Sequence, residues 1–133
     1  MKRLFIVLAV LLIVNMASAV LPPVTFNNAN LRHDVMMQHV PPIDPNDTSR
    51  PNVVDMNGLQ YLTSTSRGIS DLTGLDTAKN LLHLRLDLNL ISDVTWLSGL
   101  TKLTYLNLMD NHITNITPLA PLVNLQYLYL YII

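Results

Sequence analysis

Leucine and other aliphatic residues recur in the second half of the chain at a constant interval of 22 residues, as from Leu84 to Leu106 and from Leu106 to Leu128. The clearest unit carries them at Leu81, Leu84, Leu86, Ile91, Val94, Leu97 and Leu100. The next unit repeats them at Leu103, Leu106, Leu108, Ile113, Ile116, Leu119 and Leu122, and a further unit opens with Leu125, Leu128 and Leu130. A degenerate copy comes before these, with Leu59, Leu62, Ile69, Leu72, Leu75 and Ala78. Such a fixed period indicates a solenoid of stacked repeats.

The three later units begin with a Leu-x-x-Leu-x-Leu segment, in which leucine alternates with more polar residues. This alternation predicts a strand with one buried face. The four strands are expected near residues 61–65, 83–87, 105–109 and 127–131. After each strand the leucines are three residues apart, as in 96–100 and 118–122, which suits short 3₁₀ turns on the opposite side. A single unit buries too little to be stable, so the units must stack.

An asparagine follows the strand in two of the units, at Asn89 and Asn111. Its amide offers two donors and an acceptor to backbone groups that a stacked turn leaves without partners. We therefore interpret these two residues as a structural asparagine ladder rather than as ligand-binding or catalytic groups. The degenerate copy departs from the pattern, because Ser64 replaces a leucine and Arg67 replaces the asparagine.

The segment from Leu84 to Val94, with the repeats around it, resembles the leucine-rich repeat family. It is most similar to the bacterial 22-residue subtype of internalin-like proteins, and the resemblance covers about Val53 to Ile133. It implies an α/β solenoid, with a parallel sheet on the concave side, short 3₁₀ or irregular segments on the convex side and a helical N-terminal cap. The usual role of this family is to bind another macromolecule.

The N-terminus is typical of a secretory signal peptide. Lys2 and Arg3 precede an apolar run from Leu4 to Val14, which is short for a membrane span. Residues 17–19 are Ala-Ser-Ala, which matches the small-x-small pattern of a cleavage site. We predict cleavage after Ala19, and hence a secreted or cell-surface protein of a bacterium. The alternative is a membrane anchor that is retained. The expected organisation is a signal peptide at 1–19, an N-terminal cap at 20–58 and repeats at 59–133.

The cap is expected to contain one short helix that starts after Asn28, a favourable N-cap residue, and ends before Pro41 and Pro42. The segment from Ile43 to Asn52 is predicted to be a loop. The first layer of a solenoid needs an apolar cover. We assign this cover to Phe26, Leu31, Val35 and Met36, with Val53 and Met56 joining the stack.

Composition excludes several function classes. The net charge is −1, which does not suit a nucleic-acid backbone, and the chain has no cysteine for disulfides, thiolate metal sites or thiol catalysis. The four histidines (His33, His39, His83 and His112) lack the spacing of metal ligands. Neither a nucleophile elbow nor a phosphate-binding glycine loop is present. We expect neither an enzyme nor a cofactor.

Residues between the strand leucines should form columns on the concave face, because each position returns once in every repeat. All five tyrosines fall in these columns, and tyrosine favours both interfaces and strands. The sequence predicts that this face binds a protein or a glycan. The candidate ligand-binding residues are Tyr61, His83, Arg85, Asp87, Tyr105, Asn107, Tyr127 and Tyr129.

The last repeat breaks off at Ile133, where the pattern calls for the next asparagine. We expect the sequence to be a fragment of a longer surface or secreted protein. Two alternatives stay open: a truncated gene remnant without function, and a chain whose last strand is buried by a partner or by edge-to-edge self-association. The competing function is a structural spacer for a missing C-terminal domain.

Overall fold

Four short strands form one parallel sheet in their order along the chain. They are β1 (Tyr61–Thr63), β2 (His83–Arg85), β3 (Tyr105–Asn107) and β4 (Tyr127–Tyr129). Each residue pairs with its equivalent in the next repeat, so that Tyr61 lies beside His83, His83 beside Tyr105 and Tyr105 beside Tyr127. The 22-residue period of the sequence is therefore the register of the sheet. The computed structural model describes residues 23–38, 51 and 53–131.

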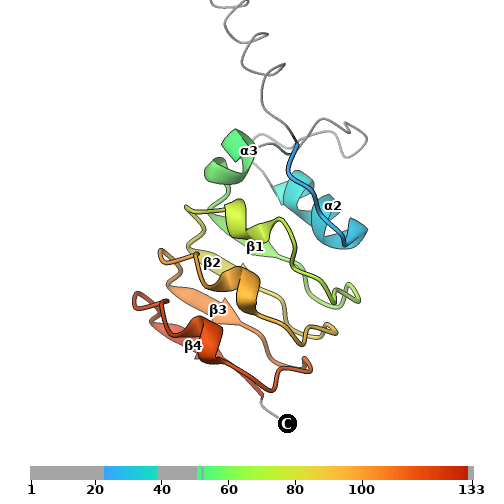
Figure 1. Cartoon of the computed structure of the whole chain (residues 1–133). Helices are drawn as coiled ribbons and strands as arrows, with labels where there is room; N and C mark the ends of the chain where they lie inside the picture. The colour runs from blue at the N-terminus through green and yellow to red at the C-terminus, as the bar shows by residue number, and fades with distance from the viewer. Residues whose placement is uncertain (1–22, 39–50, 52, 132–133) are drawn as a thin grey trace, which may run out of the picture.

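One 3₁₀ helix follows each of the first three strands. These helices are η1 (Leu75–Thr77), η2 (Thr95–Leu97) and η3 (Thr117–Leu119). Figure 1 shows them stacked as short coils on one side of the molecule, with the strands behind them in this view. The predicted solenoid, with a parallel sheet on one side and 3₁₀ turns on the other, is confirmed.

The strands are shorter than predicted, with three residues each instead of five. Ser66, Leu88 and Asp110 have positive φ angles of 56°, 59° and 52°, and these residues occupy the same position in successive repeats. These left-handed residues come directly after the predicted strands and turn the chain out of the extended direction there. Backbone hydrogen bonds between the turns continue past the strands, since the Leu88 N–H still donates to the Met109 carbonyl at 3.0 Å.

The core consists of one aliphatic layer per turn. In the strands Leu62, Leu84 and Leu106 are fully buried. On the other side the leucines of the 3₁₀ helices point into the same core, where Leu75 and Leu97 are fully buried and Leu119 is 7% exposed. Burial of aliphatic surface between successive turns is the main favourable term in the folding of such a stack.

Two helices precede the sheet, α2 (Ala29–Gln38) and α3 (Val53–Gly58). The Leu31 N–H donates to the Asn28 Oδ1 at 3.0 Å, so the predicted N-cap is confirmed. The predicted cover is present at the residues that are described: Leu31, Val35 and Met56 join the core, Met36 is buried and Phe26 packs against the core. The side chain of Val53, the signal peptide and Pro41–Pro42 lie outside the described residues. Helix α3 was not predicted, and no helix within the described ranges is long and apolar enough to cross a membrane.

Helix α2 also covers the first edge of the sheet. The Gln38 side-chain amide lies against the backbone of Thr63 in β1: the Thr63 N–H donates to Gln38 Oε1 and the Gln38 Nε2 donates to the Thr63 carbonyl, both at 2.6 Å. The amide thus makes the pair of hydrogen bonds that another strand would make. An exposed strand edge is a site for unwanted pairing, and this contact blocks it at β1.

A buried carboxylate explains why the first repeat departs from the pattern. Asp34 of α2 is 3% exposed. Its Oδ2 accepts hydrogen bonds from the Ser64 hydroxyl at 2.5 Å and the Arg67 Nε at 3.1 Å, and its Oδ1 accepts one from an Arg67 terminal nitrogen at 3.0 Å. Ser64 and Arg67 are the two residues that replace the repeat leucine and asparagine. The degenerate copy is therefore adapted to bind the cap.

Asn89 and Asn111 point into the turns that follow their strands, and both are nearly buried. The Asn89 Nδ2 donates to the Ser64 and Leu86 carbonyls at 2.7 and 2.9 Å, and its Oδ1 accepts from the Arg67 and Ile69 N–H groups at 3.0 Å. Asn111 repeats three of these four contacts one turn later. Its Nδ2 donates to the Leu86 and Leu108 carbonyls, and its Oδ1 accepts from the Ile91 N–H. Each amide thus joins its own turn to the preceding one.

Replacing Asn111 by alanine should destabilise the fold. The change removes the amide that accepts one hydrogen bond from a buried backbone N–H and donates to two backbone carbonyls. We expect the free energy of unfolding to fall by about 1–3 kcal/mol. Urea denaturation followed by circular dichroism measures this loss, with His112→Ala at an exposed neighbouring position as the control. Equal stability of the two variants would show that Asn111 has no ladder function.

Replacing Asp34 by alanine should loosen the contact between cap and repeats. The change leaves the Ser64 hydroxyl without its partner and frees the half-exposed Arg67, and we expect a loss of about 1–3 kcal/mol. The matched variant is Asp34→Ala with Ser64→Leu, which restores the repeat leucine and should recover part of the loss. If the double variant is no more stable than Asp34→Ala, the adaptation of Ser64 to Asp34 is disproved.

Candidate functional site

A row of aromatic side chains crosses the concave face of the sheet. We call it the aromatic strip, and it consists of Tyr61, His83, Tyr105, Tyr127 and Tyr129. Parallel register places the first four side by side, one from each strand. The column predicted from the 22-residue period is therefore present in the structure.

The centre of the strip is the most tightly packed part. The rings of His83 and Tyr105 are stacked, with centroids 3.9 Å apart and planes 5° from parallel. Tyr105 also contacts Tyr127 and Tyr129, with centroids 6.2 and 5.5 Å away. Tyr61 lies on the other side of His83, with its centroid at 6.1 Å. The rings thus hold one another in a continuous surface, because aromatic pairs at these distances attract.

The strip leaves much of its aromatic surface open. Tyr61 is 62% exposed, Tyr127 56% and Tyr129 43%, whereas His83 and Tyr105 are half-buried between their neighbours. Exposed aromatic surface that is already ordered can be buried by a partner at a small entropic cost.

A polar cluster borders the strip. Arg85 donates from Nε to Asp87 Oδ1 at 3.2 Å and from a terminal nitrogen to Asp87 Oδ2 at 3.3 Å. Thr65 and Asn107 also donate to Asp87 Oδ1, at 3.2 and 3.3 Å. Asp87 is 8% exposed and Asn107 9%, so these two side chains have less accessible surface than the sequence pattern predicts. The two hydrogen bonds to Asp87 orient Arg85, whose side chain is 42% exposed.

Known proteins share this architecture. The family model described as leucine-rich repeats in two copies matches residues 79–121. The crystal structure of an internalin, InlF of Listeria monocytogenes, superposes with a TM-score of 0.74 at 30% identity over 84% of this chain. The repeats of this chain are internalin-like leucine-rich repeats.

Two further structures extend the comparison. The functional domain of the internalin InlJ of Listeria monocytogenes is 25% identical over 85% of this chain, with a TM-score of 0.63. A structure with the CBM51-2 and INT domains of Clostridium perfringens ZmpB, in complex with GlcNAc, is 33% identical over 70% of it, with a TM-score of 0.58. This chain spans 33%, 26% and 19% of the InlF, InlJ and ZmpB chains. No curated protein sequence matches the chain.

Leucine-rich repeat domains of this type are generally protein-binding modules without catalytic activity. Within the described residues, no group of three or more histidine or acidic side chains could hold a metal ion. The eight ligand-binding candidates occupy or border one face of this internalin-like solenoid, while Asn89 and Asn111 are turned into its interior.

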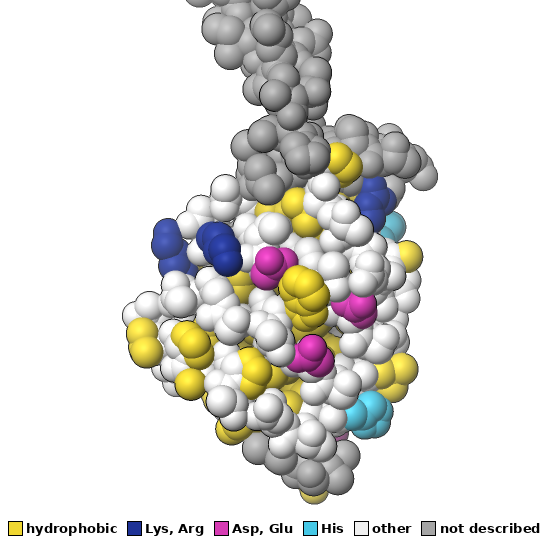
Figure 2. Space-filling model, in the orientation of Figure 1, with side chains coloured by type: hydrophobic (Ala, Val, Ile, Leu, Met, Phe, Trp, Pro, Cys, Tyr) yellow, Lys and Arg dark blue, Asp and Glu magenta, His cyan; other side chains and the backbone are white. Residues whose placement is uncertain are grey.

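The opposite side of the solenoid carries a feature that sequence reasoning missed. Trp96 of η2 is 37% exposed and lies beside two hollows. In Figure 2 the 3₁₀ side shows hydrophobic surface among acidic side chains, with basic side chains nearby. A signal for it was available, because the residues one repeat before and after Trp96 are Gly74 and Pro118.

The stacked pair in the strip should be measurably coupled. We expect a double-mutant cycle of His83→Ala and Tyr105→Ala to give an interaction energy of about 0.5–1.5 kcal/mol from the stacking contact. The measurement is the unfolding free energy of the wild type, both single variants and the double variant. The pair Tyr61→Ala and Tyr129→Ala, whose rings do not touch, is the control and should give additive effects. Additivity in both cycles would contradict a packed strip.

Proposed function

We propose that this chain is the recognition part of an exported bacterial protein and binds a protein partner through the aromatic strip. The observation that carries the proposal is the continuous row of partly exposed rings across all four strands. Aromatic side chains are enriched among the residues that dominate binding energy in protein interfaces. The row therefore has the composition of an interface centre, with Arg85 at its border.

Export is part of the same proposal. The segment from Met1 to Ala19 has the pattern of a secretory signal peptide, and the internalin-like neighbours are surface or secreted proteins. We propose the boundaries 1–19 for the signal peptide, 20–58 for the cap and 59–133 for the repeats. In this organisation the cap covers the first turn and leaves the concave face free for a partner.

The decisive variant is Tyr105→Ala combined with Tyr127→Ala. The two changes remove the centre of the strip, and we expect the affinity for a partner to fall by about 2 kcal/mol or more, roughly thirty-fold. The full chain is applied to an array of extracellular protein domains, and the affinity of each bound domain is then measured by surface plasmon resonance. Far-UV circular dichroism should be unchanged.

The control removes two exposed aliphatic side chains outside the sheet, with Ile116→Ala and Val123→Ala. This variant should keep the affinity of the wild type. If the tyrosine variant also keeps it, the partner binds elsewhere and the proposal for the strip fails. If no array protein binds the wild type, the spacer function becomes the better explanation.

A further inference from the structure

The 3₁₀ side presents one large aromatic side chain. Trp96 is the only tryptophan of the chain, and it is 37% exposed in η2. The stack does not need an indole at this position, because the next repeat has Pro118 and the preceding one has Gly74. Gly74 is itself constrained, since a Cβ there would come within 2.5 Å of the Thr25 carbonyl oxygen. Trp96 is thus an addition to the repeat and not part of its pattern.

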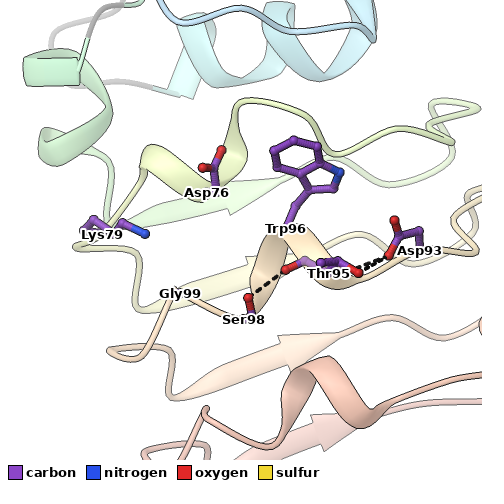
Figure 3. A pocket seen from close by; sticks show the side chains of 7 residues that line it. All are labelled: Asp76, Lys79, Asp93, Thr95, Trp96, Ser98 and Gly99. Carbon is purple, nitrogen blue, oxygen red and sulfur yellow. Dashed lines mark hydrogen bonds between the residues drawn. The ribbon is translucent and has the colours of Figure 1, made fainter.

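Two hollows flank this indole. The first, of about 300 Å³, is lined by Asp76, Lys79, Asp93, Thr95, Trp96, Ser98 and Gly99. The second, of about 510 Å³, is lined by Asn27, Ser70, Asp71, Leu72, Thr73, Asp93 and Trp96. Trp96 and Asp93 belong to both, so they form the wall between the two hollows. Figure 3 shows the indole rising from η2, with Asp76 to one side and Asp93 to the other.

The polar groups around the indole are held in place. Thr95 donates its N–H and its hydroxyl to Asp93 Oδ1, at 2.8 and 2.6 Å. Asp71 accepts the Thr73 N–H at 2.7 Å and the Asn27 Nδ2 at 2.9 Å. The pKa of Asp71 is lowered, mainly by a hydrogen bond from the Thr73 side chain. The pKa of Asp93 is lowered in the same way, mainly by a hydrogen bond from the Thr95 side chain. Both are ionised at neutral pH and present fixed acceptor oxygens.

The charges around the indole are mixed. Lys79 and Asp76 both line the first hollow, and the Lys79 Nζ lies close to Gly99. Asp71 and Asp93 line the second, and each carboxylate already receives donors from neighbouring residues. An anionic ligand would be repelled by the three carboxylates and a cationic one by Lys79, and Asp71 and Asp93 already have hydrogen-bond partners. A neutral ligand with many hydroxyl groups meets neither obstacle.

We propose that Trp96 and its two hollows form a saccharide-binding site on the 3₁₀ side of the solenoid. One sugar ring lies with its C–H face on the indole, and its hydroxyls donate to Asp93 and Asp71. The second hollow extends the site toward Asn27 and Ser70, so that a neighbouring sugar of an oligosaccharide can be accommodated. A concave site with an aromatic wall and a few placed polar groups is suited to such a ligand. This site is separate from the aromatic strip.

The single tryptophan provides a direct readout. The full chain is titrated with the tetrasaccharides of β-1,4-linked glucose, β-1,4-linked N-acetylglucosamine and β-1,4-linked mannose. We expect at least one of them to shift the tryptophan fluorescence saturably, because no other indole contributes. We expect isothermal calorimetry to give the same affinity, unchanged between about 0.05 and 0.5 M salt because the contacts are not ion pairs.

The test variant is Trp96→Pro, which gives η2 the Thr-Pro-Leu sequence that η3 already has at 117–119. We expect it to keep its circular dichroism and to lose at least about tenfold in calorimetric affinity, the equivalent of about 1.4 kcal/mol. Trp96→Ala is the second variant in case the proline disturbs the turn. The control is Tyr105→Ala with Tyr127→Ala, which should bind the saccharide as the wild type does.

Three results would overturn the proposal. The first is the absence of a fluorescence or calorimetric response to all three saccharides. The second is a response that survives both Trp96 variants or disappears in the tyrosine variant, which would place the sugar on the concave face. The third is a response to hexalysine alone, abolished by salt, which would identify the site as a binder of cationic peptides. The protein-array experiment is separate from these titrations, so failure of the saccharide site and failure of the aromatic strip as a protein-binding surface can be told apart.

Discussion

The parallel register, in which each strand residue pairs with its equivalent one repeat later, is the constraint on which the rest of the structure depends. It places each strand leucine on the leucine of the next turn, so that a continuous core forms from units that are too small to fold alone. It also places each turn asparagine beneath the carbonyls of the preceding turn. A shift of one residue would turn the leucines to solvent and remove these hydrogen bonds together. The burial of the leucines and the hydrogen bonds of the asparagines therefore both require the same register.

The first turn has to meet a helix instead of another turn, and its chemistry changes accordingly. Asp34 lies where its carboxylate reaches Ser64 and Arg67, the two positions that the repeat otherwise gives to leucine and asparagine. Gln38 completes the junction by pairing with the backbone of Thr63. Departures from the consensus thus mark the contact with the cap. They are adaptations of the first repeat, because every polar group involved has a partner.

Periodicity made the strands, the 3₁₀ side and the aromatic column predictable, since each follows from residues one repeat apart in the sequence. The Asn28 cap was predictable because its hydrogen bond is local. The Asp34 cluster was not, because its partners Ser64 and Arg67 are distant in the sequence and no pattern links them to it. The near burial of Asn107 likewise depends on Asp87 of the neighbouring turn. The strand lengths were overestimated, because the leucine alternation continues through residues that are hydrogen-bonded between turns but lie outside the strands.

A solenoid separates the positions that maintain its core from those that face solvent. The leucine and asparagine positions of each turn are occupied by the core and the ladder, so the positions between them are free to vary without loss of the register. On the concave side this freedom is used by rings that pack against one another across the strands. On the 3₁₀ side it is used once, by an indole between a glycine and a proline of the adjacent repeats. Because the buried apolar core lies between the two surfaces, a substitution on one can leave the other intact, and each can be tested alone.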